Sequence, residues 1–215
     1  MTAGQAESSG RGTGGLRSRS FVALLITQGF GSLNDNVFRW FCVLQGMKIE
    51  SMKASTMSLG LICFTIPYLL LASHSAYVAD RFSKRKTIVA CKIAEVVIMA
   101  LAVGAMALGA VDEMLGIYLV FAAVFLMGAQ SAMFGPAKFG SIPEIVRSEK
   151  ISEANGLMQM VTTAASALGM FAGFVVSSLA DLSPGDPTAA GLMWPAGSVI
   201  SIAALGMVAS LFIEP

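Results

Sequence analysis

Six long apolar segments are the feature that most restricts how this chain of 215 residues can fold. Each segment is close to the roughly 20 residues that a helix needs to cross the hydrocarbon core of a bilayer. Charged residues make up only 13% of the chain, whereas a soluble domain has about 25%. The sequence therefore predicts an all-α membrane protein with six transmembrane helices in a bundle at 20–215. The predicted spans are 21–45, 57–79, 87–108, 114–136, 155–179 and 194–212.

Basic residues indicate how the bundle is oriented. Residues 1–19 are rich in Gly and Ser and carry several arginines, a composition typical of a disordered basic tail. Most other Lys and Arg residues outside the spans fall on the same side as this tail, and only Lys48 and Lys53 fall on the opposite side. By the positive-inside rule, both termini are predicted to be cytoplasmic in a multi-pass protein of the cell inner membrane. The net charge of +1 gives no reason to expect a nucleic-acid partner.

The first apolar segment contains a polar cluster. Asn34, Asp35 and Asn36 are followed by Arg39, and Gln28 lies one to two helical turns earlier. A charge at the centre of a bilayer costs about 2.5–3.5 kcal/mol, so such residues usually face a polar cavity or a partner. Asp35 and Arg39 are four residues apart and can pair on one helix face. We interpret the cluster as a binding site for a polar head group or a coupling ion; an ion pair that only lowers the insertion cost is the alternative.

The third segment carries a second charged pair. Lys92 and Glu95 are three residues apart, so they share one face of a helix. We expect an intramembrane pair that ties this helix to a neighbour.

The fourth segment carries further candidates. Gln130 and Ser131 are polar residues in an apolar run and are candidate site residues, and Gly135, Pro136 and Lys138 mark the expected interruption of the helix. A polar and glycine-containing first segment matched by a similar fourth segment is typical of transporters built from a three-plus-three inverted repeat. Chance similarity between two apolar helices is the alternative.

The loop between the second and third spans resembles the signature loop G-x-x-x-D-R-x-G-R-K of the major facilitator superfamily. Small residues stand at both glycine positions of the motif, and Ser83 is a poorer turn residue wherever a positive φ is required. The resemblance implies half of a twelve-helix transporter, in which this loop helps to set the balance between inward-open and outward-open states. Asp80 is also one possible partner of Lys138, the other being a lipid phosphate. Asp80, Arg81, Lys84 and Arg85 match the motif, and Ala76 and Ser83 stand in place of its glycines.

Three further stretches, 30–36, 92–95 and 125–138, resemble the lysophospholipid transporter branch of that superfamily. The resemblance implies inward movement of lysophospholipid by alternating access. The implied partners are membrane lipid, the lysophospholipid substrate, and a missing C-terminal six-helix half or a second chain. The same module occurs fused to an acyltransferase and an acyl-carrier-protein synthetase, so a cytoplasmic acyltransferase is a further candidate partner.

Two alternatives stay open: a superfamily transporter for another small solute, such as a drug or sugar, and a non-transporting membrane module of an acyltransferase system. We expect no enzymatic activity, cofactor or metal, because the sequence contains no Walker loop, nucleophile elbow or cluster with metal-ligand spacing.

Overall fold

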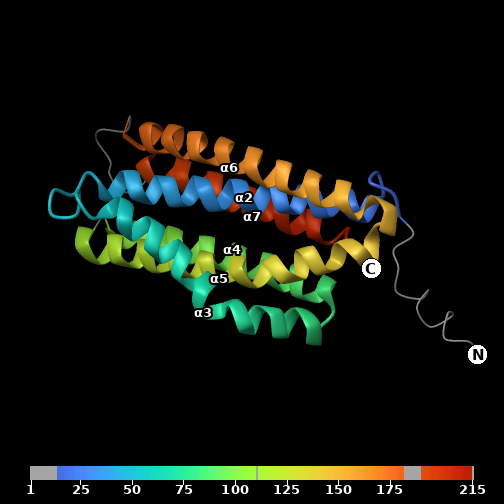
Figure 1. Cartoon of the computed structure of the whole chain (residues 1–215). Helices are drawn as coiled ribbons and strands as arrows, with labels where there is room; N and C mark the ends of the chain where they lie inside the picture. Colours follow the sequence, from blue (N-terminus) through green and yellow to red (C-terminus); the bar gives the residue numbers. More distant parts are fainter. Residues whose placement is uncertain (1–13, 110, 182–189, 215) are drawn as a thin grey trace, which may run out of the picture.

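The computed structural model describes residues 14–109, 111–181 and 190–214. The described residues contain six long α-helices that lie side by side in one bundle (Figure 1). No β-strand occurs among them, and Gly14 and Val146 form only an isolated bridge. The helices are α2 (Arg19–Gly46), α3 (Thr56–Arg81), α4 (Lys84–Gly109), α5 (Glu113–Ile145), α6 (Ile151–Asp181) and α7 (Ala190–Ser210), and a short 3-10 helix, η2 (Ser148–Lys150), precedes α6.

Four stretches of the described chain are helical, long and apolar enough to cross a membrane: α3, α4, α5 and the segment Ser148–Ala180 that contains α6. In α7 only the shorter stretch Pro195–Ser210 qualifies as apolar, and α2 falls outside this group. The polar residues of α2 lower its hydropathy, although the helix has 28 residues and is therefore long enough to span. The chain is thus a multi-pass helical protein, with four of the six predicted spans supported by length and composition.

The chain before α2 is held against the end of α5. The Gly14 backbone N–H donates to the Ile145 carbonyl at 3.1 Å, and the Arg147 N–H donates to the Gly14 carbonyl at 3.0 Å. The Ser18 side chain then caps α2 by accepting from the Phe21 N–H at 3.4 Å. The predicted tail at 1–19 therefore extends too far, because backbone hydrogen bonds begin at Gly14 and Ser18 caps α2. Residues 1–13 of that prediction lie outside the described residues.

The expected interruption of the fourth segment at Gly135 and Pro136 is wrong. Helix α5 contains Pro136 and Pro143 and continues to Ile145. A proline inside a helix removes one backbone hydrogen bond. Helix α5 nevertheless continues because its last turns pack inside the bundle, where Ala137 and Ile142 are fully buried. Packing of this kind routinely overrides a local helix-breaking preference.

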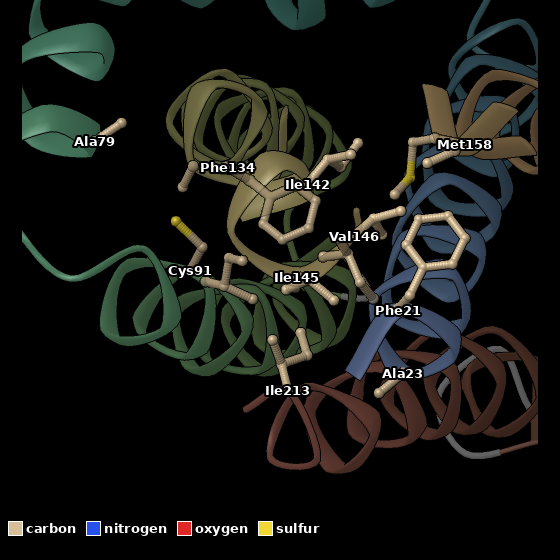
Figure 2. Packing of buried hydrophobic residues seen from close by; sticks show 14 residues of the cluster. Phe21, Ala23, Ala79, Cys91, Phe134, Ile142, Ile145, Val146, Met158 and Ile213 are labelled. Carbon is tan, nitrogen blue, oxygen red and sulfur yellow. The ribbon is translucent and has the colours of Figure 1, made fainter. Parts of the chain in front are cut away.

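Of the three apolar cores among the described residues, the two larger ones lie one toward each end of the bundle. Figure 2 shows the core at the end where α2 begins, with Phe21 of α2 near Val146 and Met158 and with Ile213 below Ile145. The second core includes Phe38 of α2 and residues from α4, α5 and α7. Basic residues gather at the end near the first core, so we call it the basic end. They include Arg19 at the start of α2, Arg81 at the end of α3, Lys84 at the start of α4, and Arg147 and Lys150 between α5 and α6.

Helices α2 and α6 approach each other closely. A Cβ atom at Gly169 would lie 2.6 Å from the Leu33 carbonyl oxygen, and one at Gly173 would lie 2.8 Å from the Val37 carbonyl oxygen. These two glycines are four residues apart on α6, the spacing of a small-residue contact face in membrane helices. The close contact places the polar part of α2 directly beside α6.

Candidate functional site

A polar cavity of about 230 Å³ lies between the two apolar cores. Its walls come from five helices, α2, α3, α4, α5 and α6. Of the residues predicted from the sequence, those that line it are Gln28, Asp35, Asn36, Lys92, Gln130, Ser131 and Lys138. The packing of the bundle thus brings predicted polar residues from three different helices, α2, α4 and α5, into one site.

Asp35 is the buried acid of the cavity. Ser131 Oγ of α5 donates a hydrogen bond to Asp35 Oδ2 at 2.6 Å. The residue is only 8% exposed, and its second carboxylate oxygen, Oδ1, has no hydrogen-bond partner within the described part of the chain. Buried polar atoms are almost always hydrogen-bonded. Asp35 Oδ1 is therefore available to a ligand, a cation or a water molecule in the cavity.

The ion pair that the spacing of Asp35 and Arg39 allows does not form. Arg39 Nη2 instead donates to Asn36 Oδ1 at 2.7 Å, and its guanidinium lies 5.1 Å from the centre of the Phe64 ring of α3. The physical reason is packing: Asp35 is bonded to α5, while the longer Arg39 side chain extends toward α3. A spacing of four residues allows an ion pair, but neighbouring helices decide whether one forms.

Lys138 enters the cavity from α5. Its Nζ donates to Gln28 Oε1 of α2 at 3.1 Å, and it lies 4.5 Å from the Phe139 ring centre. The side chain is only 8% exposed, and no carboxylate among the described residues forms an ion pair with it. Asp80, one of the two possible partners named from the sequence, therefore does not pair with Lys138, and the other, a lipid phosphate, stays a prediction. Lys138 is turned inward by its bond to Gln28.

Gln28 connects three helices at this site. Its Nε2 donates to Ser32 Oγ at 2.7 Å and to Thr162 Oγ1 of α6 at 2.9 Å, in addition to the bond from Lys138 to Oε1. These bonds fix the orientation of the amide, so that its oxygen faces the lysine. Gln28 therefore positions Lys138 at the cavity wall.

Lys92 and Glu95 form a buried ion pair on α4. The distance from Lys92 Nζ to Glu95 Oε2 is 2.5 Å, and both side chains are at most 2% exposed. Asn34 Nδ2 of α2 donates to Glu95 Oε1 at 3.1 Å, so the pair links α4 to α2. Gly31 provides the space, because a Cβ there would overlap Lys92 Nζ. This is the geometry expected of a pair that ties the third predicted span to a neighbour.

The charges of the site do not balance. Lys92, Lys138 and Arg39 are opposed by two carboxylates, Asp35 and Glu95. The Phe134 ring lies 5.0 Å from Lys92 Nζ and 5.7 Å from Lys138 Nζ, and such contacts with an aromatic face stabilise cations. With all five groups charged, the site has one excess positive charge. An anionic group would balance it.

An apolar groove of about 370 Å³ begins at Arg39 and lies between α2 and α3. Apart from Arg39 and Ser58, its lining is apolar or glycine: Trp40, Val43, Met57, Gly60 and Leu61. Arg39 is bonded to Asn36, which lines the polar cavity, so the groove and the cavity lie next to each other at this arginine, although they share no lining residue. A molecule with a charged head and an apolar tail would find both environments side by side.

The signature loop lies away from the cavity, at the basic end. Asp80 and Arg81 are exposed at the end of α3, and Ser83 precedes α4 without a positive φ, so the serine in place of glycine is unstrained. Lys84 Nζ lies 2.7 Å from Glu144 Oε1 of α5, and Arg85 Nη2 donates to the Leu211 carbonyl at 3.2 Å. The loop thus fastens α4 to α5 and to the end of α7, while Ala76 is exposed on α3.

Sequence reasoning missed several cavity residues. Thr162 and Ser166 of α6 are polar, four residues apart in an apolar helix, and could have been found by that spacing. Tyr68 and Phe134 carry no such signal, because single aromatic residues are common in apolar helices. The further lining residues that the sequence analysis missed are Gly31, Ser32 and Phe64.

Long helices that are apolar outside and enclose a buried charged cavity define a membrane protein with an internal polar site. Comparison with known proteins places this architecture in a family: the model of the Major Facilitator Superfamily matches residues 18–215. The chain belongs to that superfamily.

Several relatives are bacterial proteins named lysophospholipid transporter LplT. The one from Cronobacter sakazakii is 30% identical over 192 residues, which cover 89% of this chain and 41% of the relative. The one from Yersinia pestis strain Pestoides F is 31% identical over 198 residues, which cover 92% of this chain and 43% of the relative. The chain therefore spans about two fifths of the length of these relatives. No solved structure matches it.

Proposed function

We propose that this chain forms one wall of a transporter that moves lysophospholipid inward across the bacterial inner membrane by alternating access. The observation that carries the proposal is the close approach of a cationic polar cavity and an apolar groove, whose lining residues Asn36 and Arg39 are hydrogen-bonded to each other. A lysophospholipid has one phosphate-containing head and one acyl chain, so the two compartments suit its two parts. The names of the relatives from Cronobacter and Yersinia support the same substrate class.

The head group would occupy the cavity. Lys138 is the buried cation without a carboxylate partner, and a phosphate oxygen would accept a charge-assisted hydrogen bond from its Nζ. Arg39 offers further donors at the entrance to the groove. Asp35 Oδ1, which lacks a donor, would accept from the cationic part of a head group or bind a coupling cation. Gln130 and Ser131 complete this wall.

The acyl chain would lie in the groove between α2 and α3. Most of the groove lining cannot form hydrogen bonds, so a polar group of the solute would be unfavourable there. This disfavours sugars and other solutes that are polar throughout. Arg39 would then mark the boundary between head and tail, since its guanidinium bonds to the cavity residue Asn36 while its side chain lines the groove.

The packing of the helices supports the three-plus-three repeat. Helix α2 packs against α6 as α5 packs against α3, and α2 packs against α7 as α5 packs against α4. This is the pattern that results when α2–α4 are matched to α5–α7. With the repeat, α2 and α7 would also span, giving six spans with both termini cytoplasmic. A second six-helix half, or a second chain, would close the open side of the site.

The test is uptake of radiolabelled lysophosphatidylethanolamine into spheroplasts that produce the protein from its full gene. We expect Asp35→Asn and Lys138→Gln to lower uptake at least about tenfold, because a hydrogen bond to a charged group contributes about 1.5–3 kcal/mol. Lys53→Gln and Glu153→Gln are matched controls, since both residues are exposed and distant from the cavity. Protein levels are compared by immunoblot.

Two outcomes would contradict the proposal. Unchanged uptake by both cavity variants would show that Asp35 and Lys138 do not bind the substrate. Failure of the unmodified protein to import any lysophospholipid would rule out lysophospholipid as the substrate. An ether-linked analogue with a blocked hydroxyl, which cannot be re-acylated, separates transport from acyltransferase activity. If only the substrate that can be re-acylated accumulated, the alternative hypothesis of a non-transporting membrane module would be correct.

A further inference from the structure

A second groove, separate from the polar cavity, lies at the basic end between the start of α2 and the end of α7. It has a volume of about 530 Å³ and shares no lining residue with the cavity or with the groove at Arg39. Figure 1 shows α2 and α7 running side by side, which agrees with their direct packing. The lining residues are Arg17, Arg19, Val22, Ala23, Ile26, Leu205, Val208, Ala209 and Phe212.

The walls of this groove are apolar and remain exposed. Val22 and Ile26 of α2 face it from one side, and Leu205 and Val208 of α7 from the other, each at least 39% exposed. A continuous exposed apolar surface in a membrane-spanning bundle contacts lipid tails. The wall is therefore suited to an extended acyl chain lying along the two helices.

The mouth of the groove is cationic. Arg17 and Arg19 are exposed, and the Arg19 guanidinium lies 5.1 Å from the centre of the Phe212 ring. Neither arginine forms an ion pair with any carboxylate that the structure describes. The nearby acid is Glu214, whose backbone N–H donates to Ser20 Oγ at 3.1 Å. The arginines therefore have donors available for a phosphate.

We propose that this groove binds an anionic glycerophospholipid, with its phosphate at Arg17 and Arg19 and one acyl chain along the apolar wall. The charge complementarity selects the occupant: an apolar helix would leave two arginines without an anion, a zwitterionic lipid would bring a cationic group beside them with its phosphate, and a free phosphate would leave the apolar wall empty. Basic residues at the level of the head groups attract anionic lipids. The same contact would hold the start of α2, whose middle carries the cavity residues, against α7.

The test is native mass spectrometry of the purified protein in detergent with added phosphatidylglycerol, with phosphatidylcholine as the neutral comparison. We expect a phosphatidylglycerol adduct that is retained more strongly than phosphatidylcholine. The double variant Arg17→Gln/Arg19→Gln should weaken this binding roughly 25-fold, about fivefold for each arginine. The control Lys86→Gln/Arg147→Gln removes two exposed cations of the basic end outside the groove and should leave binding within about twofold.

A third variant separates a defined site from general attraction to positive charge. Ala209→Phe keeps both arginines and fills the groove, so a seated lipid would be lost while non-specific attraction would remain. Equal weakening by the arginine and control variants would overturn the proposal, as would undiminished binding by Ala209→Phe. Binding of inorganic phosphate as tight as that of phosphatidylglycerol would overturn the lipid assignment.

Discussion

The buried pair of Lys92 and Glu95 offers the sharpest test of the packing described above. The two charged atoms are 2.5 Å apart and the side chains are at most 2% exposed. Removing one partner leaves an uncompensated buried charge, which costs about 3–5 kcal/mol. We therefore expect Lys92→Met and Glu95→Gln each to lower the free energy of unfolding by about 3 kcal/mol or more.

The double variant Lys92→Met/Glu95→Gln should behave differently. Both charges are gone, and the glutamine oxygen still accepts the hydrogen bond from Asn34 Nδ2 that Glu95 Oε1 now accepts at 3.1 Å. Replacing a buried ion pair by neutral groups of similar volume is often neutral. We expect the double variant to be within about 1 kcal/mol of the unmodified protein, and hence more stable than either single variant.

The assay is reversible unfolding in mixed micelles with a denaturing detergent, followed by tryptophan fluorescence. Lys150 and Glu153 provide a matched control with the same residue types and spacing and a distance of 2.6 Å, but side chains 43% and 52% exposed. Removing either of these should cost less than about 1 kcal/mol. The reasoning is refuted if Lys92→Met and Glu95→Gln cost no more than the control variants, or if the double variant costs the sum of its single changes.

Three further predictions use the same unfolding assay. Gly169→Leu should cost about 1–3 kcal/mol because its side chain meets the α2 backbone, whereas Gly156→Leu on the same helix meets nothing within 4 Å and should change stability by less than about 0.5 kcal/mol; equal effects would contradict the close contact. Ser131→Ala leaves Asp35 without its donor and should cost about 1–3 kcal/mol, and an unchanged midpoint would show that this bond is not needed. Lys138→Gln should leave the free energy of unfolding unchanged or raise it, because burying a cation that has no carboxylate partner among the described residues is unfavourable. A loss above about 2 kcal/mol would mean that the charge is paired.

The helices were predictable because hydropathy along a membrane helix depends mainly on local composition. Each predicted span lies within or overlaps one helix of the structure, and Gln28, Asp35 and Asn36 of the first span line the polar cavity, whereas Asn34 and Arg39 do not. The end of the fourth span was not predictable by the same means. The rule that proline interrupts a helix considers only neighbours in sequence, whereas the turns after Pro136 are held by burial of Ala137 and Ile142 among other helices.

The partners of the polar residues were harder to predict than their positions. The spacing of Asp35 and Arg39 allowed a pair, but Ser131 of α5 competes for the carboxylate and Phe64 of α3 for the guanidinium. Lys138 was expected to reach outward, and instead bonds to Gln28, 110 residues earlier in the chain. Contacts of this kind depend on how whole helices pack, which no periodicity within one helix encodes.

The charges inside the bundle are of two kinds, and the difference separates stability from binding. Lys92 and Glu95 satisfy each other and Asn34, so they stabilise the contact between α2 and α4 and need no ligand. Within the described ranges, Lys138 has no carboxylate partner and Asp35 keeps one oxygen without a donor, so each gains a stronger interaction when a ligand enters the cavity. Natural proteins keep such unfavourable groups where function requires them. Single substitutions of Lys92 or Glu95 should therefore lower the free energy of unfolding, and substitutions of Lys138 should lower uptake without loss of stability.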